Sequence, residues 1–286
     1  MNRKICPITK METLLVATDG SEFSKNAIRE AMKLAKACSS KLIAVSVVQT
    51  NIEFEAGAPQ VIEKAEKEAV EHLESIKNMA AKEGVTCETV VHLSEDPYLD
   101  IVYEAEKNQV NLVVVGTHGR TGIRRLIMGS VAAKVIGHAP CKVLVVPLNA
   151  KVECRNILMA TDGSSYSDAA ASEAIGMAKR CESLLFVISV ASSDEEMSSA
   201  QDNVRKVVDM AEKQGIQIES IITRGGAYEA ILEAAKQKKA DLIVMGSHGR
   251  TGLKKLLMGS VTEKVVSHAE VAVLIAKLQS SSGEQI

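Results

Sequence analysis

Short apolar runs alternate with longer amphipathic segments along the whole chain. Residues 42–48 and 112–115 are almost entirely apolar and mostly β-branched, which is typical of strands covered on both faces of a parallel sheet. Between such runs, apolar residues recur at helical spacing, as at Ala27, Ala31 and Leu34. Strands that alternate with helices predict right-handed crossovers and a parallel, doubly wound α/β sheet.

The pattern predicts the same plan twice, with five strands and four helices in each half. The strands are expected at residues 11–18, 42–48, 85–92, 112–115 and 142–146, then at 156–160, 184–190, 217–223, 241–245 and 271–276. The helices are expected at residues 22–38, 62–80, 98–108 and from 131, then at 166–181, 197–214, 228–238 and 261–267.

One block of sequence occurs twice. Residues 116–131 recur at 246–261, and 11 of the 16 aligned positions are identical. A core tolerates exchanges that conserve volume but does not require the same glycines, histidine and arginine at the same spacing, so the block predicts a binding loop in two copies. The repeat divides the chain into a domain at 1–150, a second domain at 151–280 and a flexible tail at 281–286.

Each copy has the pattern Gly-x2-Gly-x9-Gly-Ser between a predicted strand and a predicted helix. Glycines let backbone N–H groups approach a ligand closely, and a helix start offers N–H groups and the positive end of the helix dipole. The pattern therefore predicts two phosphate-binding loops. Their residues are Gly116, Gly119, Gly129 and Ser130 in the first half, and Gly246, Gly249, Gly259 and Ser260 in the second.

A second repeated motif, Ala-Thr-Asp-Gly-Ser, ends the first strand of each half and contains Asp19 and Asp162. In a doubly wound sheet the first and fourth strands meet at the switch point, where ligands bind. A carboxylate at that crevice disfavours phosphates, so it is expected to accept hydrogen bonds from a sugar hydroxyl or a base. The alternative is that each aspartate caps the following helix.

Composition excludes several classes of partner. The formal net charge is −2, the chain has no Trp, and the pI is about 6.3, so the features that drive binding to nucleic acid are missing. No apolar run reaches the roughly 18 residues that a membrane span needs. We therefore expect a cytoplasmic protein with neither a nucleic-acid nor a membrane partner.

The six cysteines show neither a Cys-x-x-Cys pair nor the spacing of metal ligands. We expect them to be small buried side chains in a reducing cytoplasm rather than disulfide partners, and we predict no metal site. They are Cys6, Cys38, Cys87, Cys141, Cys154 and Cys181.

With these motifs the chain resembles the universal stress protein family, in its tandem two-domain form and its ATP-binding branch. The resemblance covers essentially all of both halves. It implies two tandem doubly wound domains, each with a five-stranded parallel sheet of order 3-2-1-4-5 and helices on both faces, that hold ATP or AMP, with Mg²⁺ accompanying ATP.

The resemblance also implies a role for each motif residue. Asp19 and Asp162 would contact ribose or adenine, and the backbone near Val47 and Val190 would face adenine. The glycines and serines of the two loops would hold ribose and phosphates.

The loops also contain histidines and arginines. His118 and His248 are candidates for acid–base chemistry, but a ligand-lining role is favoured because no carboxylate is fixed nearby in sequence. Arg120 and Arg250 either pair with phosphate or lie in solvent.

Three functions fit these features. The first is a stress or regulatory sensor that binds ATP or AMP at one site in each domain. The second is a slow ATPase or an adenylyl-transferring enzyme; the absence of a Walker loop disfavours it. The third is an interaction scaffold without ligand. We expect no catalytic residue, and at most weak hydrolysis of ATP.

The halves also differ. Residues 94–97, which include Glu95 and Asp96, correspond to an Arg-Gly-Gly-Ala segment at 224–227, so acidic groups are expected to weaken phosphate binding in the first half. Residues 142–146 and 271–275 are expected to pair within one chain, because each is an exposed edge strand. A homodimer of whole chains is a further possibility.

Overall fold

The computed structural model describes residues 5–8, 11–51, 53, 57–117, 128–249 and 258–278. The first half contains β1 (Thr13–Ala17), α1 (Glu22–Cys38), β2 (Lys41–Gln49), α3 (Pro59–Lys82), β3 (Cys87–Ser94), α4 (Pro97–Lys107), β4 (Leu112–Gly116), α5 (Ser130–His138) and β5 (Lys142–Val146). The second half contains β6 (Asn156–Ala160), α6 (Ser165–Cys181), β7 (Leu184–Ala191), α7 (Met197–Glu212), β8 (Ile218–Arg224), α8 (Ala227–Gln237), β9 (Leu242–Gly246), α9 (Ser260–His268) and β10 (Ala272–Ala276).

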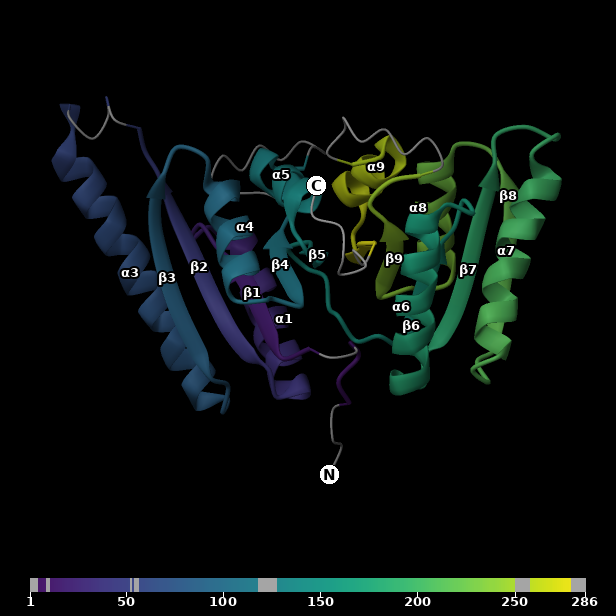
Figure 1. Cartoon of the computed structure of the whole chain (residues 1–286), viewed down its shortest axis with the longest axis horizontal. Helices are drawn as coiled ribbons and strands as arrows, with labels where there is room; N and C mark the ends of the chain where they lie inside the picture. Colours follow the sequence, from purple (N-terminus) through teal and green to yellow (C-terminus); the bar gives the residue numbers. More distant parts are fainter. Residues whose placement is uncertain are drawn as a thin grey trace.

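The strands of the two halves form one continuous sheet (Figure 1). Among the described residues it has ten strands in the order β3-β2-β1-β4-β5-β10-β9-β6-β7-β8. Each half is parallel within itself and has the order 3-2-1-4-5, which confirms the predicted fold class.

The two halves meet where β5 runs antiparallel to β10. Leu144 pairs with Leu274, and Val145 pairs with Val273. The predicted pairing within one chain is therefore confirmed, and the last strand of each half is covered by the other. In Figure 1 only the outer strands, such as β3 and β8, both rise toward the top of the view, because the sheet twists across the junction.

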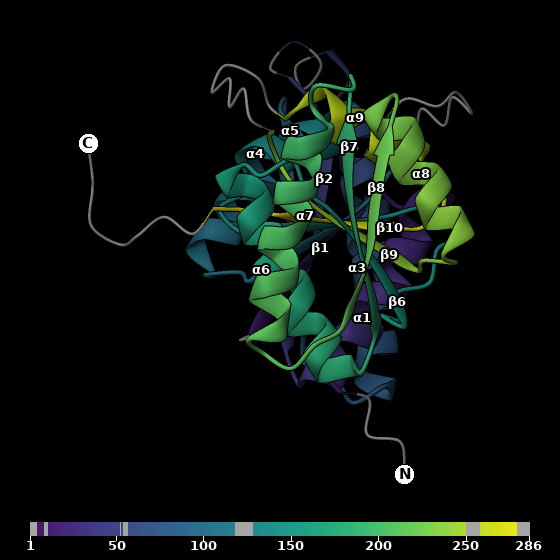
Figure 2. The same cartoon turned by 90° about the vertical axis from the view of Figure 1, so that its right-hand side faces the viewer.

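Alternate residues of each strand point to opposite faces of the sheet, and each face has its own core. Leu14 and Val16 belong to one core with residues of α1, α3, α6 and α7. Leu15 belongs to the other core with residues of α4, α5, α8 and α9. Figure 2 shows this layering in the second half, with α6 and α7 on one side of the strands and α8 on the other. Both cores continue across the junction between the halves, through Leu144 and Val145 respectively.

A short segment joins the halves and is held by α1. The side-chain amide of Asn26, which is 2% exposed, donates to the carbonyl oxygens of Pro147 and Ala150 at 2.6 and 2.8 Å. The backbone N–H of Val152 donates to Glu30 Oε2 at 3.1 Å. The two halves thus pack directly on each other, as the short linker predicted. The proposed boundary at residue 150 falls within this segment, and the tail at 281–286 lies outside the described residues.

The expectation that the cysteines are all thiols is wrong for one pair. Cys6 and Cys38 form a disulfide, with their Cα atoms 4.4 Å apart. The segment before β1 passes the end of α1, and no sequence spacing reveals this approach. All six cysteines lie in the described part of the chain, and the other four are free thiols.

In the described residues we find no helix that combines the length and the apolar character required to cross a membrane.

Candidate functional site

A cavity of about 270 Å³ opens at the carboxyl end of the strands in the first half. It lies at the switch point between β1 and β4, where connections leave toward opposite faces. Its lining includes predicted site residues from four different segments: Asp19, Val47, Gly116, Gly129 and Ser130. The other predicted residues of this half, His118, Gly119 and Arg120, lie outside the described residues.

The turn from β1 to α1 places the Asp19 carboxylate on the cavity wall. Its Oδ1 accepts hydrogen bonds from the N–H of Ser21 at 3.0 Å and from the Ser21 hydroxyl at 2.7 Å. Gly20 has a φ of 79°, a left-handed conformation that favours glycine and lets the chain reverse here. The N-cap of α1 is Ser21 rather than Asp19, so the capping alternative is wrong for this residue.

The start of α5 forms the opposite wall. Gly129 donates its N–H to the carbonyl of Thr117 at 2.9 Å, and the helix begins at Ser130. Ser130, Val131 and Ala132 all line the cavity. The first N–H groups of a helix have no partner within the helix, and α5 has no acidic residue in its first turn. This wall is therefore suited to an anion.

The remaining wall is apolar. Val45 and Val47 of β2, Ile101 of α4 and Val115 of β4 line it, and Gln49 adds an amide at its edge. Sequence reasoning missed Gln49, Pro97 and Ile101, although all three lie near strand or helix ends on the predicted ligand side. The cavity thus joins an anion-binding wall to an apolar wall across Asp19.

The acidic residues that were expected to weaken this site do not line the cavity. The Lys134 side chain of α5 donates to Asp96 Oδ1 at 3.0 Å, and its Nζ lies 4.6 Å from the centroid of the Tyr98 ring. The hydrogen bond to Asp96 raises the pKa of Lys134. Glu95 is exposed. Since Asp96 is paired with a cation, we correct this expectation.

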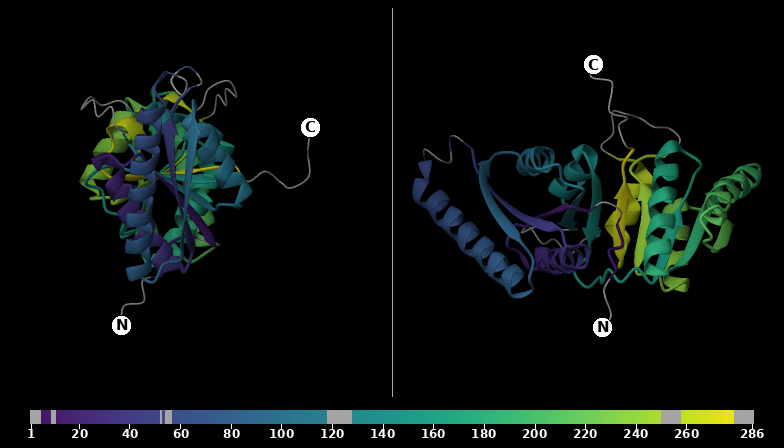
Figure 3. Two further views of the ribbon diagram at one scale, coloured as in Figure 1. Left: turned by 90° about the vertical axis from the view of Figure 1, so that its left-hand side faces the viewer. Right: turned by 60° about the horizontal axis from the view of Figure 1, so that its bottom comes forward.

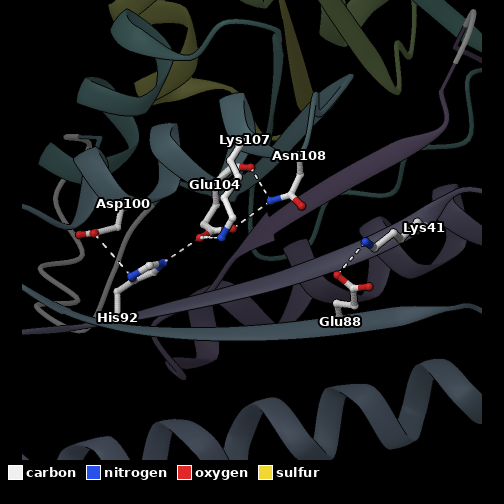
Figure 4. A network of polar contacts seen from close by, with 7 residues as sticks. All are labelled: Lys41, Glu88, His92, Asp100, Glu104, Lys107 and Asn108. Carbon is white, nitrogen blue, oxygen red and sulfur yellow. Dashed lines mark hydrogen bonds and ion pairs between the residues drawn. The ribbon is translucent and has the colours of Figure 1, made fainter.

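A polar network holds α4, and with it Ile101, against β3 (Figure 4). His92 Nε2 lies 3.2 Å from Glu104 Oε1, and His92 Nδ1 lies 3.6 Å from Asp100 Oδ1. Glu104 is 2% exposed and also accepts from Lys107 at 3.2 Å and from the Asn108 amide at 2.9 Å. The corresponding positions of the second half are Thr223, Ala230, Ala234, Gln237 and Lys238. The network is therefore a feature of the first half.

The second half brings its predicted residues together in a related way. Asp162 Oδ1 accepts the N–H of Ser164 at 3.1 Å. A Cβ atom built on Gly249 would lie only 2.7 Å from Asp162 Oδ2, so the loop backbone passes directly over this carboxylate. A Cβ on Gly246 would lie 2.8 Å from the backbone of Tyr166. A side chain at either position would collide with these atoms, so both positions require glycine.

The two halves use the serine after the Asp-Gly pair differently. The Ser21 hydroxyl donates to Asp19, whereas the Ser164 hydroxyl accepts the N–H of Ser167 and caps α6. The Asp162 carboxylate consequently holds its turn through a backbone N–H at Ser164.

His248 lies beside two neighbours in this loop. Its Nδ1 is 3.1 Å from the Ser247 hydroxyl, and its ring centroid is 5.1 Å from that of Tyr166. The Tyr166 contact was missed, although Phe23 at the same place in the first half signals an aromatic position.

The rest of the second loop ends at another helix start. Gly259 donates to the carbonyl of Ser247 at 2.9 Å, and α9 begins at Ser260. Unlike α5, α9 carries an acidic residue, Glu263, in its first turn. Val190 of β7 occupies the place of Val47 in β2 and pairs with Thr223. Arg250 lies outside the described residues.

Comparison with known proteins gives the same two units. The model of the universal stress protein family matches residues 10–147 and 153–277. Universal stress protein MJ0531 of Methanocaldococcus jannaschii is 37% identical over 139 residues, which cover 43% of this chain and 82% of that protein. Universal stress protein YxiE of Bacillus subtilis is 33% identical over 144 residues, covering 46% of this chain and 97% of that protein.

A solved structure matches both halves at once. The crystal structure of a universal stress protein from Archaeoglobus fulgidus superposes with a TM-score of 0.78, at 21% sequence identity. The match covers 95% of this chain and all of that chain. At this identity the likeness describes the fold alone, and it extends to the arrangement of two domains in one chain.

Proposed function

Since this chain belongs to the universal stress protein family, we propose that it binds an adenine nucleotide, ATP or AMP, in each half and acts as a stress-response or regulatory sensor. The observation that carries the proposal is the cavity of the first half. It joins an apolar wall, a carboxylate and a helix N-terminus within about 270 Å³.

Each part of a nucleotide has a chemical counterpart in this cavity. The N-terminus of α5 at Gly129 and Ser130 suits the phosphates, because the first N–H groups of a helix are free to bind an anion and α5 has no acidic residue in its first turn. Asp19 suits the ribose hydroxyls, which donate hydrogen bonds to a carboxylate. The apolar wall at Val45, Val47 and Ile101 suits a flat base. If ATP is the ligand, Mg²⁺ would bind to its phosphates.

The two sites are proposed to differ in affinity. Glu263 places a negative charge in the first turn of α9, where α5 has Ala133. A carboxylate there opposes a phosphate at the same helix start, so the first half is expected to bind ATP more tightly. Calorimetric titration that returned two indistinguishable sites would contradict this difference.

The Ser247 hydroxyl and the Tyr166 ring adjoin His248. Because the chain has no Walker loop, the proposal favours binding over turnover. The proposal also includes a cytoplasmic location and assembly of whole chains into a homodimer. Because disulfides are rare in the cytosol, the redox state of Cys6 and Cys38 in cells tests that location.

The binding test uses the purified full chain. Nucleotide released by denaturation is identified by mass spectrometry, and ATP and AMP are then titrated calorimetrically. Gly129→Val together with Gly259→Val is expected to abolish binding, because a branched side chain at each helix start blocks the approach of phosphate. Gly57→Val is the matched control, since a Cβ there meets no atom within 4 Å.

Two outcomes would favour the other functions. Binding of partner proteins that persists in the double glycine variant, with no nucleotide bound by the wild type, would favour a scaffold. Hydrolysis of ATP at an ordinary enzymatic rate, abolished by Ser130→Ala with Ser260→Ala, would favour an enzyme.

A further inference from the structure

The first helix of each half ends in a cysteine, at Cys38 in α1 and at Cys181 in α6. In the first half the segment before β1 brings Cys6 to this helix end, where it forms a disulfide with Cys38. In the second half the segment before β6 brings Cys154 to the corresponding place. Both cysteines of this second pair are thiols in the structure.

Backbone pairing fixes the approach of Cys154 to the end of α6. The hydroxyl of Ser183, two residues beyond Cys181, donates to the carbonyl of Cys154. The N–H of Leu184 donates to the carbonyl of Arg155 at 2.8 Å. Between these contacts the Cys154 and Cys181 side chains pack in the same core, and each sulfur shifts the pKa of the other.

The two sulfurs differ in exposure and in acidity. Cys154 is 3% exposed, whereas Cys181 is partly exposed at the helix end. The neighbouring Cys154 thiol has the largest effect on the pKa of Cys181 and lowers it; burial opposes this effect, and the positive charge of Arg180 lowers the pKa further. Cys181 is thus the sulfur that reaches solvent and that more readily becomes a thiolate, which is the nucleophile in exchange with disulfides.

We propose that Cys154 and Cys181 are a redox site that forms a second disulfide by exchange with a small-molecule disulfide such as glutathione disulfide. The Cys181 thiolate attacks one sulfur of that disulfide and releases one glutathione thiolate, which takes up a proton. Cys154 then loses its proton to solvent and attacks Cys181 Sγ, which expels the second glutathione. The protein dithiol is oxidised, and one glutathione disulfide is reduced to two glutathione thiols.

The two cysteine pairs are joined at the base of the molecule, where the segment before β1 passes beneath the junction of the halves (Figure 3). Arg180, next to Cys181, donates to the carbonyl of Pro7 through Nε at 3.0 Å and through a terminal nitrogen at 2.6 Å. Pro7 adjoins Cys6. A Cys154–Cys181 disulfide would therefore link the segment between the halves covalently to α6. It would lie beside the Cys6–Cys38 disulfide, which links the segment before β1 to α1.

The test equilibrates the full chain in buffers of increasing ratio of glutathione disulfide to glutathione. After an acid quench the thiols are alkylated, and the chain is digested with trypsin without reduction. We expect a linked pair of peptides, residues 152–155 and 181–205, to rise with that ratio. The alkylated thiols should fall from four to two per chain, leaving Cys87 and Cys141.

Three variants test which cysteines take part in the exchange. In Cys154→Ala, Cys181 is expected to retain a mixed disulfide with glutathione, because no second thiol is present to expel it. In Cys87→Ala and Cys141→Ala, the linked pair should form as in the wild type.

Two results would overturn the proposal. In the first, the peptides 152–155 and 181–205 stay alkylated at every ratio of glutathione disulfide to glutathione. The internal control is the Cys6–Cys38 disulfide, seen as residues 5–10 linked to residues 37–41, which must be intact at those ratios. The other is a link from Cys181 to a cysteine other than Cys154.

Discussion

Lys142 Nζ on the last strand of the first half lies 2.8 Å from Glu173 Oε2 on the first helix of the second half. The side chains of Lys142 and Glu173 are only 21% and 14% exposed. The second oxygen of this carboxylate, Oε1, is buried and has no hydrogen-bond partner among the described residues. The ion pair therefore joins the halves beside the β5–β10 ladder and depends on Lys142 to offset a mostly desolvated charge.

Replacing Lys142 by Met is expected to lower the free energy of unfolding by about 2 kcal/mol, because it leaves the Glu173 carboxylate without its cation. Adding Glu173→Leu should recover most of that loss. Urea unfolding of both variants measures the effect. Equal stability of the single and double variants would show that the ion pair is too solvated to matter.

Asn26 holds the segment between the halves through two hydrogen bonds from one amide. Asn26→Ala is expected to cost about 2–3 kcal/mol, because the carbonyls of Pro147 and Ala150 lose a buried donor. The second half has Ala169 at this place. Asn78→Ala, on the exposed face of α3, should change stability by less than about 0.5 kcal/mol in the same urea titration. Similar effects of the two substitutions would contradict the role of Asn26.

Asp241 and Asn111 occupy the same place in the two halves and accept the same backbone hydrogen bonds. Asp241 Oδ2 accepts from the N–H groups of Arg155 and Asn156 at 2.9 and 3.2 Å. Asn111 Oδ1 accepts from Glu12 and Thr13 at 2.8 and 3.0 Å. Burial is the main cause that raises the pKa of Asp241, against the opposing effect of these hydrogen bonds.

This difference predicts a dependence of stability on pH. Since the folded pKa lies above the unfolded one, the folded state keeps a proton that the unfolded state has lost, and stability falls as pH rises through that window. Asp241→Asn is therefore expected to stabilise the protein at pH 7 by roughly 0.5–1 kcal/mol, after allowance for partial solvation, and to have no such effect near pH 3.

Asn111→Asp is the converse test and should destabilise the protein at pH 7 but not near pH 3. Thermal unfolding at both pH values measures the two variants. A gain from Asp241→Asn that is the same at pH 3 and pH 7 would show that ionisation is not its cause.

Gly249 lies against Asp162 in the second half, with room for no Cβ atom. Gly249→Ala is expected to displace the Asp162 carboxylate and to weaken nucleotide binding at this site about tenfold, or about 1.4 kcal/mol. Titration in the Gly129→Val background isolates the second site. Gly57→Ala is the control, and an unchanged affinity in Gly249→Ala would remove Asp162 from the proposed contact.

Much of this fold could be predicted because its strands are short apolar runs and its helices have regular apolar faces. The limits of the elements were less accurate. Val85 was expected to begin a strand, but β3 begins at Cys87. Val85 donates its N–H to the carbonyl of Ala80 and is buried at 6% exposure, so it completes the turn after α3. An apolar residue at such a turn has the same pattern as the start of a strand.

The parts of the candidate site that lie next to a strand end or a helix start in the sequence could be predicted. Asp19, Gly116 and Gly129 come straight after strands or before a helix, and the structure brings them to one cavity. Ile101 and the pairing of Lys134 with Asp96 depend on how α4 and α5 pack across the sheet. The Cys6–Cys38 disulfide depends on the path of the segment before β1. Contacts between elements that are far apart in the chain produce no motif of fixed residue spacing, so the sequence alone does not reveal them.

The antiparallel ladder between β5 and β10 joins two strands of the same chain. Separate chains that met through such an edge would come apart on dilution, because their association depends on protein concentration. Here the encounter is intramolecular, and its effective concentration is set by the short segment held by Asn26. Each molecule therefore carries the two halves in a fixed one-to-one ratio at any level of expression.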